Sequence, residues 1–308
     1  DPRNLHSFPT RRSSDLIGPV ERVGYGLGDF ASNLMWGGIA TFMTFFYTDV
    51  AGLAAASIGT MMLVSRIFDG ISDVAMGIIM DRTRSRHGKA RPWLLWMAAP
   101  FAISLTLLFT VPPLGPTGRL IWAFVTYNLA ATVVYTAVNI PYGALTSLIS
   151  QDQHQRTLLN IVRMLMAVLV RVLVSMGTLP LVKALGDGSQ GWQRTFAFYG
   201  ALGAALFIIT FRTTRERVRS AKREDRLVPV ADGLRALGSN VPWMIMLGMN
   251  LVMQVSQGLG GVGIYYAEYV LGDKNLVGVL SMAGLVPVIL GLALIAPFMK
   301  RWGKRNVA

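Results

Sequence analysis

Two carboxylates lie four residues apart within a long apolar stretch of the chain. The stretch covers about residues 54–80 and contains Asp69 and Asp73, with Ser72 beside the second carboxylate. Residues four apart lie on the same face of an α-helix. In a membrane-crossing helix, an ionised side chain at the centre costs roughly 2.5–3.5 kcal/mol and needs a compensating partner. These oxygen-bearing side chains therefore predict a site for a cation or a proton.

The chemistry of this helix face leaves several interpretations open. A hard cation such as Na⁺ prefers carboxylate and hydroxyl oxygens, whereas a proton would reside on one of the two carboxylates. A third interpretation is a structural ion pair between Asp69 and Arg66, which lies one turn earlier. The spacing alone does not choose among them.

A second pair of polar residues, Asp29 and Asn33, lies in the first apolar stretch. The four-residue spacing again puts both side chains on one helix face. An amide at membrane depth that faces the bundle interior both donates to and accepts from sugar hydroxyls. We therefore interpret Asn33 as a substrate ligand, with Asp29 either beside it or at the cytoplasmic interface.

A third group lies in the sequence YTAVNIPYGAL, which combines Tyr135, Thr136, Asn139 and Tyr142 with Pro141. A proline removes one backbone hydrogen bond and bends a helix. A polar bend between aromatic residues suits a sugar, because rings stack on sugars and amides bond to hydroxyls. The alternative is a packing kink whose polar groups are satisfied internally.

Two arginines, Arg163 and Arg171, share the fifth apolar stretch. Positions eight apart differ by about 80° around a helix, so both can approach one cavity. Arg163 is close enough to the cytoplasmic end to extend toward water. Arg171 lies deeper, and its partner would be an aspartate of the second stretch or an anionic substrate.

The elements that must position these residues are membrane-spanning helices. Hydrophobic residues make up 53% of the chain, charged residues 15%, and the mean hydropathy is +0.47, which indicates an all-α polytopic membrane protein. The net charge of +13 resides mainly in loops, which argues against a nucleic-acid partner. The absence of cysteine excludes disulfides and thiolate metal sites.

Eight apolar segments are long enough to span a bilayer. Lysine and arginine concentrate in every second loop, notably 81–91 and 212–235. The positive-inside rule therefore places the amino terminus in the cytoplasm. The segments cover about 24–48, 54–80, 92–112, 119–149, 158–186, 194–211, 241–270 and 276–299.

The long basic connection divides the chain into two bundles. We interpret 1–16 as a translated sequencing adapter, 17–211 as an amino-terminal six-helix bundle and 212–240 as a cytoplasmic linker. Residues 241–308 would be the first two helices of a second bundle. The expected fold is therefore an incomplete major facilitator fold with about eight of twelve helices.

The loop after the second segment carries Asp81, Arg82, Arg84 and Arg86. One role of this loop is to fix membrane topology. We also expect a gate, because charges at helix ends can pair in one state of a transport cycle and separate in another.

Several segments together resemble the glycoside–pentoside–hexuronide:cation symporters, the melibiose-permease-like branch of the major facilitator superfamily. They are YGLGDFASNLMW, FFYTDVAGL, SRIFDGISDVAMG, DRTRSRHGKARPW and NIPYGALTSLISQDQHQRT. The resemblance implies twelve helices, alternating access, and sugar uptake coupled to Na⁺, Li⁺ or H⁺ without another cofactor. The segment NIPYGAL and the ending GKRN are most similar to the glucuronide-carrier branch.

The resemblance also implies residue roles. Asp69 and Asp73 match the cation-site carboxylates and Thr136 a further cation-site hydroxyl, while Ser72 stands where sodium-using members have asparagine.

Asn33 and Asn139 stand where the galactoside transporter has two sugar-binding aspartates, and Arg163 matches an arginine that lines the site. Two neutral amides near Arg163 and Arg171 would tolerate a uronate carboxylate better than two aspartates would.

The sequence thus predicts a monomeric, multi-pass symporter of the inner membrane that imports a glycoside, pentoside or hexuronide with Na⁺ or H⁺. A membrane enzyme is disfavoured, because the chain has no cysteine, no HExxH motif and no paired histidines. The remaining alternatives are a transporter-fold protein for another small solute and a non-transporting sensor or scaffold.

Overall fold

The computed structural model describes residues 17–218, 235–258, 262–284 and 287. The expected adapter segment at 1–16, most of the linker and most of the eighth apolar segment lie outside these residues. Side chains at 254–258 are also outside the description.

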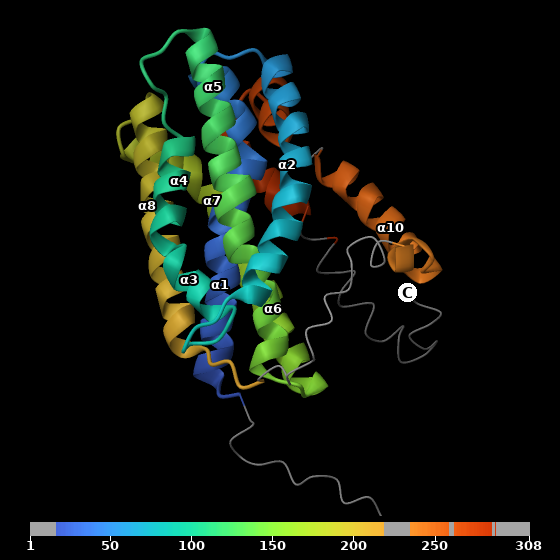
Figure 1. Ribbon diagram of the computed structural model, residues 1–308. Coiled ribbons are helices and arrows are strands. Elements are labelled where there is room, and N and C mark those ends of the chain that lie inside the picture. Colours follow the sequence, from blue (N-terminus) through green and yellow to red (C-terminus); the bar gives the residue numbers. More distant parts are fainter. Residues whose placement is uncertain (1–16, 219–234, 259–261, 285–286, 288–308) are drawn as a thin grey trace, which may run out of the picture.

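The described residues are helical and contain no strand, which confirms the predicted all-α class. Figure 1 shows α1 to α8 side by side along one axis, with α10 projecting from the bundle. The elements are α1 (Pro19–Gly38), η2 (Ile39–Met43), η3 (Phe46–Val50), α2 (Ala55–Arg82), α3 (Arg91–Trp96), α4 (Ala98–Leu108), α5 (Pro116–Tyr127), η4 (Asn128–Tyr135), α6 (Thr136–Ile149), α7 (Gln153–Ala184), α8 (Gly188–Thr213), α10 (Val241–Gly258), α11 (Gly263–Tyr265), η6 (Tyr266–Val270) and η7 (Lys274–Leu276).

Three described helical segments are apolar and long enough to cross a membrane by length and composition. They are Pro116–Ile149, Gln153–Ala184 and Gly188–Thr213, with shorter apolar helices at Ala98–Leu108 and Val241–Met253. The 28-residue helix α2 has the length of a span, and the charged residues of the candidate site interrupt its apolar surface.

The ends of two helices differ from the ends of the predicted apolar segments. The third segment breaks at Met97, between α3 and α4. The sixth segment, predicted as the shortest, is the 26-residue α8, which begins at Gly188. Its first turns are polar and contain Ser189, Gln190 and Gln193. Hydropathy identifies only the apolar part of a helix, so it does not predict these turns.

Helix α1 occupies the middle of the bundle and packs against α7 and α8. A Cβ at Gly28 would meet the Tyr142 ring, and one at Gly38 would meet the Phe196 ring. Glycine therefore permits the close helix approach that packing within a bilayer requires.

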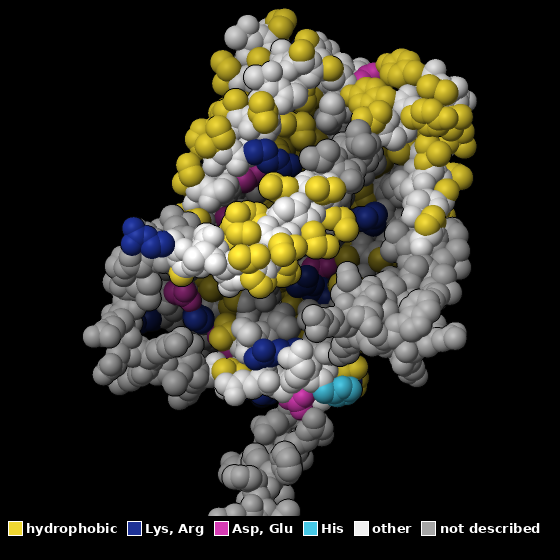
Figure 2. All heavy atoms as spheres, turned by 90° about the vertical axis from the view of Figure 1, so that its right-hand side faces the viewer, with side chains coloured by type: hydrophobic (Ala, Val, Ile, Leu, Met, Phe, Trp, Pro, Cys, Tyr) yellow, Lys and Arg dark blue, Asp and Glu magenta, His cyan; other side chains and the backbone are white. Residues whose placement is uncertain are grey.

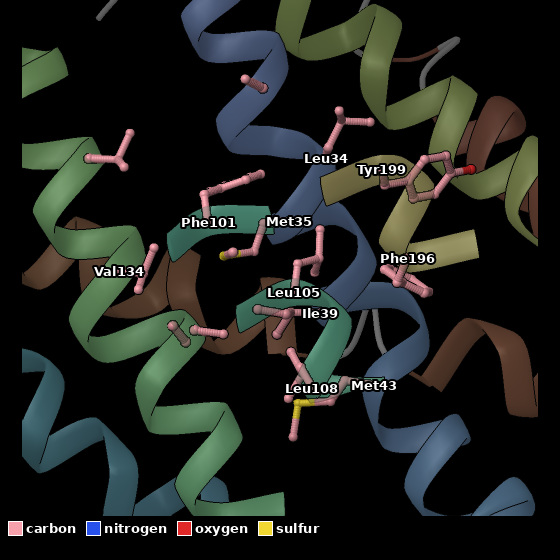
Figure 3. Close-up of a cluster of buried hydrophobic side chains, with 14 of the residues drawn as sticks. Leu34, Met35, Ile39, Met43, Phe101, Leu105, Leu108, Val134, Phe196 and Tyr199 are labelled. Atoms are coloured by element: carbon pink, nitrogen blue, oxygen red, sulfur yellow. The ribbon is translucent and has the colours of Figure 1, made fainter. Parts of the chain in front are cut away.

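The core of the bundle is built from apolar side chains of α1, η2, α4, η4 and α8. Figure 3 shows them converging between these helices. Phe101 and Phe207 meet edge to face, with ring centroids 5.0 Å apart. This packing holds α1 and η4 in place, and both carry residues of the candidate site.

Helix α2 lies at the edge of the bundle and packs on η4, α5 and α6. Its other side exposes large apolar residues, including Leu63, Ile67 and Ile71. Every residue from Val241 to Met253 of α10 is also exposed. These apolar surfaces are of the kind that lipid or further helices cover.

Candidate functional site

The carboxylate of Asp69 lies in the contact between α2 and η4. Its Oδ1 accepts a hydrogen bond from the Thr132 hydroxyl. Its Oδ2 lies 3.2 Å from an Arg66 guanidinium nitrogen, and the two side chains are 21% and 49% exposed. The ion pair considered from the spacing is therefore present, but it engages one carboxylate oxygen and leaves the other to a hydroxyl.

Asp73 lies one turn further along α2 and is exposed. Its Oδ1 accepts a 3.0 Å hydrogen bond from Thr136 Oγ1. The Ser72 hydroxyl lies 3.5 Å from Thr136 Oγ1 and donates to the backbone carbonyl of Asp69. The structure thus brings together the four residues that the sequence predicts as cation ligands.

Three residues that sequence reasoning missed complete this contact. Thr132 also lies 3.2 Å from Asn128 Oδ1, and Asn128 Nδ2 donates to Ser65 Oγ at 2.9 Å. Asn128, Thr132 and Thr136 are spaced four residues apart, so the sequence could have predicted that they share a helix face. The sequence could not have predicted the register between α2 and η4, which brings Thr132 to Asp69.

An aromatic surface borders the carboxylates. The Arg66 guanidinium lies over the Trp36 ring at 5.7 Å, and Trp36 stacks on Tyr135 with centroids 5.3 Å apart. Both rings are half-buried. A flat indole and phenol at this position suit the apolar face of a sugar ring.

The first and fifth apolar segments also meet, and they bring three of the predicted substrate ligands together. Arg163 Nε lies 3.7 Å from Asp29 Oδ1, and Asn33 Nδ2 donates to Asp29 at 2.8 Å on the backbone oxygen and 3.2 Å on Oδ2. Asp29 is thus held by an amide and a guanidinium, which makes this cluster able to bind polar or anionic groups.

Three other predicted substrate ligands, Tyr142, Asn139 and Arg171, lie outside this cluster. Tyr142 is 1% exposed, stacks on Tyr25, and donates to the Tyr25 carbonyl at 2.7 Å. In this conformation it packs α6 against α1 and offers no surface to a substrate, which corrects its expected role. Asn139 is half-buried. Arg171 is exposed, and within the described part of the chain it forms no ion pair.

The charged loop between α2 and α3 folds back on itself. Lys89 Nζ lies 2.8 Å from Asp81 Oδ1, whereas Arg82, Arg84 and Arg86 are exposed. Asp81 therefore pairs with a lysine of its own loop, whereas the sequence predicts a pairing with arginines across helix ends.

A carboxylate from the start of the linker fixes the same loop. Glu216 accepts backbone N–H groups from Lys89, Ala90 and Arg91 at 3.1, 2.9 and 2.8 Å. A Cβ at Gly88, whose φ is +105°, would overlap this carboxylate. Three amides at the start of α3 thus receive the partners that helix termini otherwise lack.

A second carboxylate anchors the linker to α1. Glu21 accepts two hydrogen bonds from the Arg217 guanidinium, at 2.8 and 2.7 Å, and one from the Arg215 backbone at 3.0 Å. Bidentate arginine–carboxylate contacts have strict geometry. The residues after α8 are thus tied to two parts of the bundle.

At the opposite end of the bundle, residues of the first and seventh apolar segments meet. Thr48 and Tyr265 share a 2.8 Å hydrogen bond between hydroxyls, and Tyr269 donates to Asp49 at 2.8 Å. These contacts close one end of the molecule between η3 and the α11–η6 segment.

Charge clusters interrupt an apolar surface on the face seen in Figure 2, where acidic and basic side chains lie in recesses between hydrophobic patches. Among the described residues, no group of three or more histidine, cysteine, aspartate or glutamate side chains is placed to hold a metal ion. A cation at Asp69 and Asp73 would therefore rely on hydroxyl oxygens as well.

The family model for MFS/sugar transport proteins matches residues 24–308. The chain belongs to this family. The predicted membership of the sugar-transporting branch of the major facilitator superfamily is thereby confirmed, and the chain belongs to an integral membrane protein.

The curated relatives of the chain are transporters and not enzymes. The uncharacterized symporter YnaJ of Bacillus subtilis is 38% identical over 297 residues, which are 94% of this chain and 64% of that protein. The isoprimeverose transporter of Lactiplantibacillus pentosus is 37% identical over 292 residues, 93% of this chain and 60% of that protein. The glucuronide carrier protein homolog of Escherichia coli is 33% identical over 291 residues, 92% and 62% of the two chains. The chain thus spans less than two thirds of the length of these relatives.

Proposed function

We propose that the chain forms the greater part of a cation-coupled symporter that imports a glycoside, pentoside or hexuronide by alternating access. The observation that carries this proposal is the cluster of Asp69 and Asp73 with the hydroxyls of Thr132 and Thr136. Ionisable groups within membrane helices are functional-site candidates by default, and here Asp69 is half-buried whereas Asp73 is exposed.

The coupling ion in this proposal is Na⁺ or H⁺, with Li⁺ as a further candidate. It occupies the contact of α2 with η4 and α6, beside the Trp36–Tyr135 surface where the sugar would lie. Coupling follows from linkage: if the ion strengthens sugar binding, the sugar strengthens ion binding by the same factor.

The substrate proposal rests on the cluster of Asp29, Asn33 and Arg163. The relatives include proteins named for isoprimeverose and for glucuronide. A neutral sugar would use the amides of Asn33 and Asn139, and a uronate carboxylate would compete with Asp29 for Arg163.

For the whole protein, we propose twelve helices in the inner membrane, with the amino terminus in the cytoplasm and no required oligomer. We propose the amino-terminal bundle at 17–211, the linker at 212–240 and the second bundle from 241 onward, as the sequence predicts, with α8 extending to Thr213. The basic loop at 81–91 supports this orientation.

Transport by the full-length protein tests the proposal. Right-side-out membrane vesicles should accumulate a labelled glycoside or glucuronide when an inward Na⁺, Li⁺ or H⁺ gradient is imposed. Asp73→Asn should abolish accumulation but retain sugar exchange, because exchange does not require net movement of the ion. A folded protein that accumulates no glycoside under any gradient would overturn the symport proposal in favour of another solute or a sensor.

A further inference from the structure

The Thr132 hydroxyl faces two acceptors at once. One is Asp69 Oδ1 on α2, and the other is Asn128 Oδ1, 3.2 Å away on the preceding turn of η4. A hydroxyl has one proton and two lone pairs, so it donates to only one of these oxygens at a time. Rotation about the Cβ–Oγ bond moves the proton between them without moving the side chain.

The orientation of the Asn128 amide is fixed by its other contacts. Its Nδ2 donates to Ser65 Oγ at 2.9 Å and to the Phe124 carbonyl at 2.8 Å. Ser65 in turn donates to the Met61 carbonyl at 2.9 Å, which leaves its oxygen free to accept. A flipped amide would put Oδ1 against the Phe124 carbonyl, so the network holds Oδ1 toward Thr132.

The two oxygens of Asp69 are not equivalent. Arg66 engages Oδ2, so an incoming cation meets Oδ1 and therefore approaches Thr132 Oγ1. The cation repels the hydroxyl proton but attracts the oxygen lone pair. Asn128 Oδ1 is the acceptor to which that proton can turn.

We propose that Thr132 is a ligand of the coupling cation and that Asn128 makes this possible by accepting the hydrogen bond of the Thr132 hydroxyl when the cation binds. This inference rests on the proposed symport and concerns Na⁺ or Li⁺ as the ion. It adds a pair of residues, one ligand and one positioning residue, to the four predicted from the sequence.

Cation dependence of sugar binding tests the proposal on the full-length protein, purified and measured by calorimetry. Thr132→Val keeps the shape but removes the hydroxyl. It should raise the half-saturating Na⁺ or Li⁺ concentration by about tenfold or more, the usual effect of losing a contact to a charged group. Sugar binding at saturating cation should be unchanged, and Thr132→Ser should stay near wild type.

A control and a second variant separate the roles. Thr106→Val removes a hydroxyl that bonds only to its own helix backbone and should leave cation dependence unaltered. Asn128→Leu should also weaken cation binding, and the double variant with Thr132→Val should be no weaker than Thr132→Val alone, because Asn128 acts through Thr132. If Thr132→Val does not fold, Thr132→Ala is measured in the same way.

Four outcomes would overturn the inference. Wild-type cation dependence in Thr132→Val would exclude Thr132 from the site, and additive effects in the double variant would exclude the switch of the Thr132 hydrogen bond to Asn128. Sugar accumulation driven by H⁺ with no response to Na⁺ or Li⁺ would overturn the inference but leave the symport proposal standing. Absence of coupling to any ion would defeat both.

Discussion

The phenol hydroxyl of Tyr269 donates a 2.8 Å hydrogen bond to the carboxylate of Asp49. The two residues belong to η6 and η3, which are 220 positions apart in sequence. Together with the bond between Thr48 and Tyr265, this contact closes one end of the molecule. In the proposed alternating-access cycle, we expect such contacts to form in one state and to break in the other.

Weakening this closure should therefore shift the population toward the state that is open at that end. The chain contains no cysteine, so a single cysteine at Asn139 reports access to the interior. Tyr269→Phe should increase its labelling rate by a membrane-impermeant thiol reagent several-fold. The matched control is Tyr266→Phe, because Tyr266 is exposed and has no such bond among the described residues. Equal labelling in the two variants would contradict a closing role for the contact.

Gly88 should be intolerant of any side chain. Its φ of +105° and its contact with the Glu216 carboxylate both exclude a Cβ. We expect Gly88→Ala to destabilise the protein by about 1–3 kcal/mol, the cost of a strained backbone position, seen as a lower midpoint of thermal unfolding in detergent. Gly77→Ala is the control, because nothing lies within 4 Å of a Cβ there. A Gly88→Ala protein as stable as the control would show that the loop adapts at no cost.

The pair of Asp29 and Arg163 should decide between uronides and neutral glycosides. Arg163→Gln is expected to lower glucuronide affinity by about tenfold, the range for a charge-assisted hydrogen bond, and to change affinity for the uncharged glucoside little. Asp29→Asn should act in the opposite direction, because it frees the guanidinium. Competition binding with the two sugars measures both effects. Arg171→Gln is the comparison, and a glucuronide-specific loss there instead would move the anion site to Arg171.

The stacked rings of Trp36 and Tyr135 should contribute to sugar affinity. Trp36→Leu is expected to weaken sugar binding at saturating cation by about tenfold, whereas Trp36→Phe should retain most of it, since aromatic contacts are worth about 0.5–1.5 kcal/mol beyond buried area. Titration of intrinsic fluorescence or calorimetry gives the affinities. Trp96→Leu changes an exposed tryptophan on α3 and serves as the control. Unaltered affinity in Trp36→Leu would exclude the rings as a sugar surface.

Much of the helical order follows from the sequence, because a membrane requires apolar segments of fixed length with charges between them. The spacing of Asp69, Ser72 and Asp73 also gave the correct common face. Spacing within one helix, however, says nothing about its register against another. The contact of Asp69 with Thr132 depends on that register, and so does the burial of Tyr142 against Tyr25.

The boundaries that sequence reasoning missed have a similar cause. Backbone hydrogen bonding continues through polar residues at the start of α8, and Met97 interrupts a segment that is apolar on both sides. Hydropathy measures which solvent a segment prefers, whereas helix ends depend on local capping and packing. The carboxylate of Glu216 on the α3 amides is a cap supplied from 125 residues away, beyond the reach of any local pattern.

The clasp formed by Glu216 and the Glu21–Arg217 pair has a mechanical consequence. The residues between the end of α8 and Val218 are held to the first bundle by these two carboxylates and by the Leu148 carbonyl, which accepts hydrogen bonds from the Arg217 and Val218 backbone. A force applied to the chain beyond Val218 would therefore act first on these contacts at α1 and at the loop between α2 and α3, and not on the end of α8.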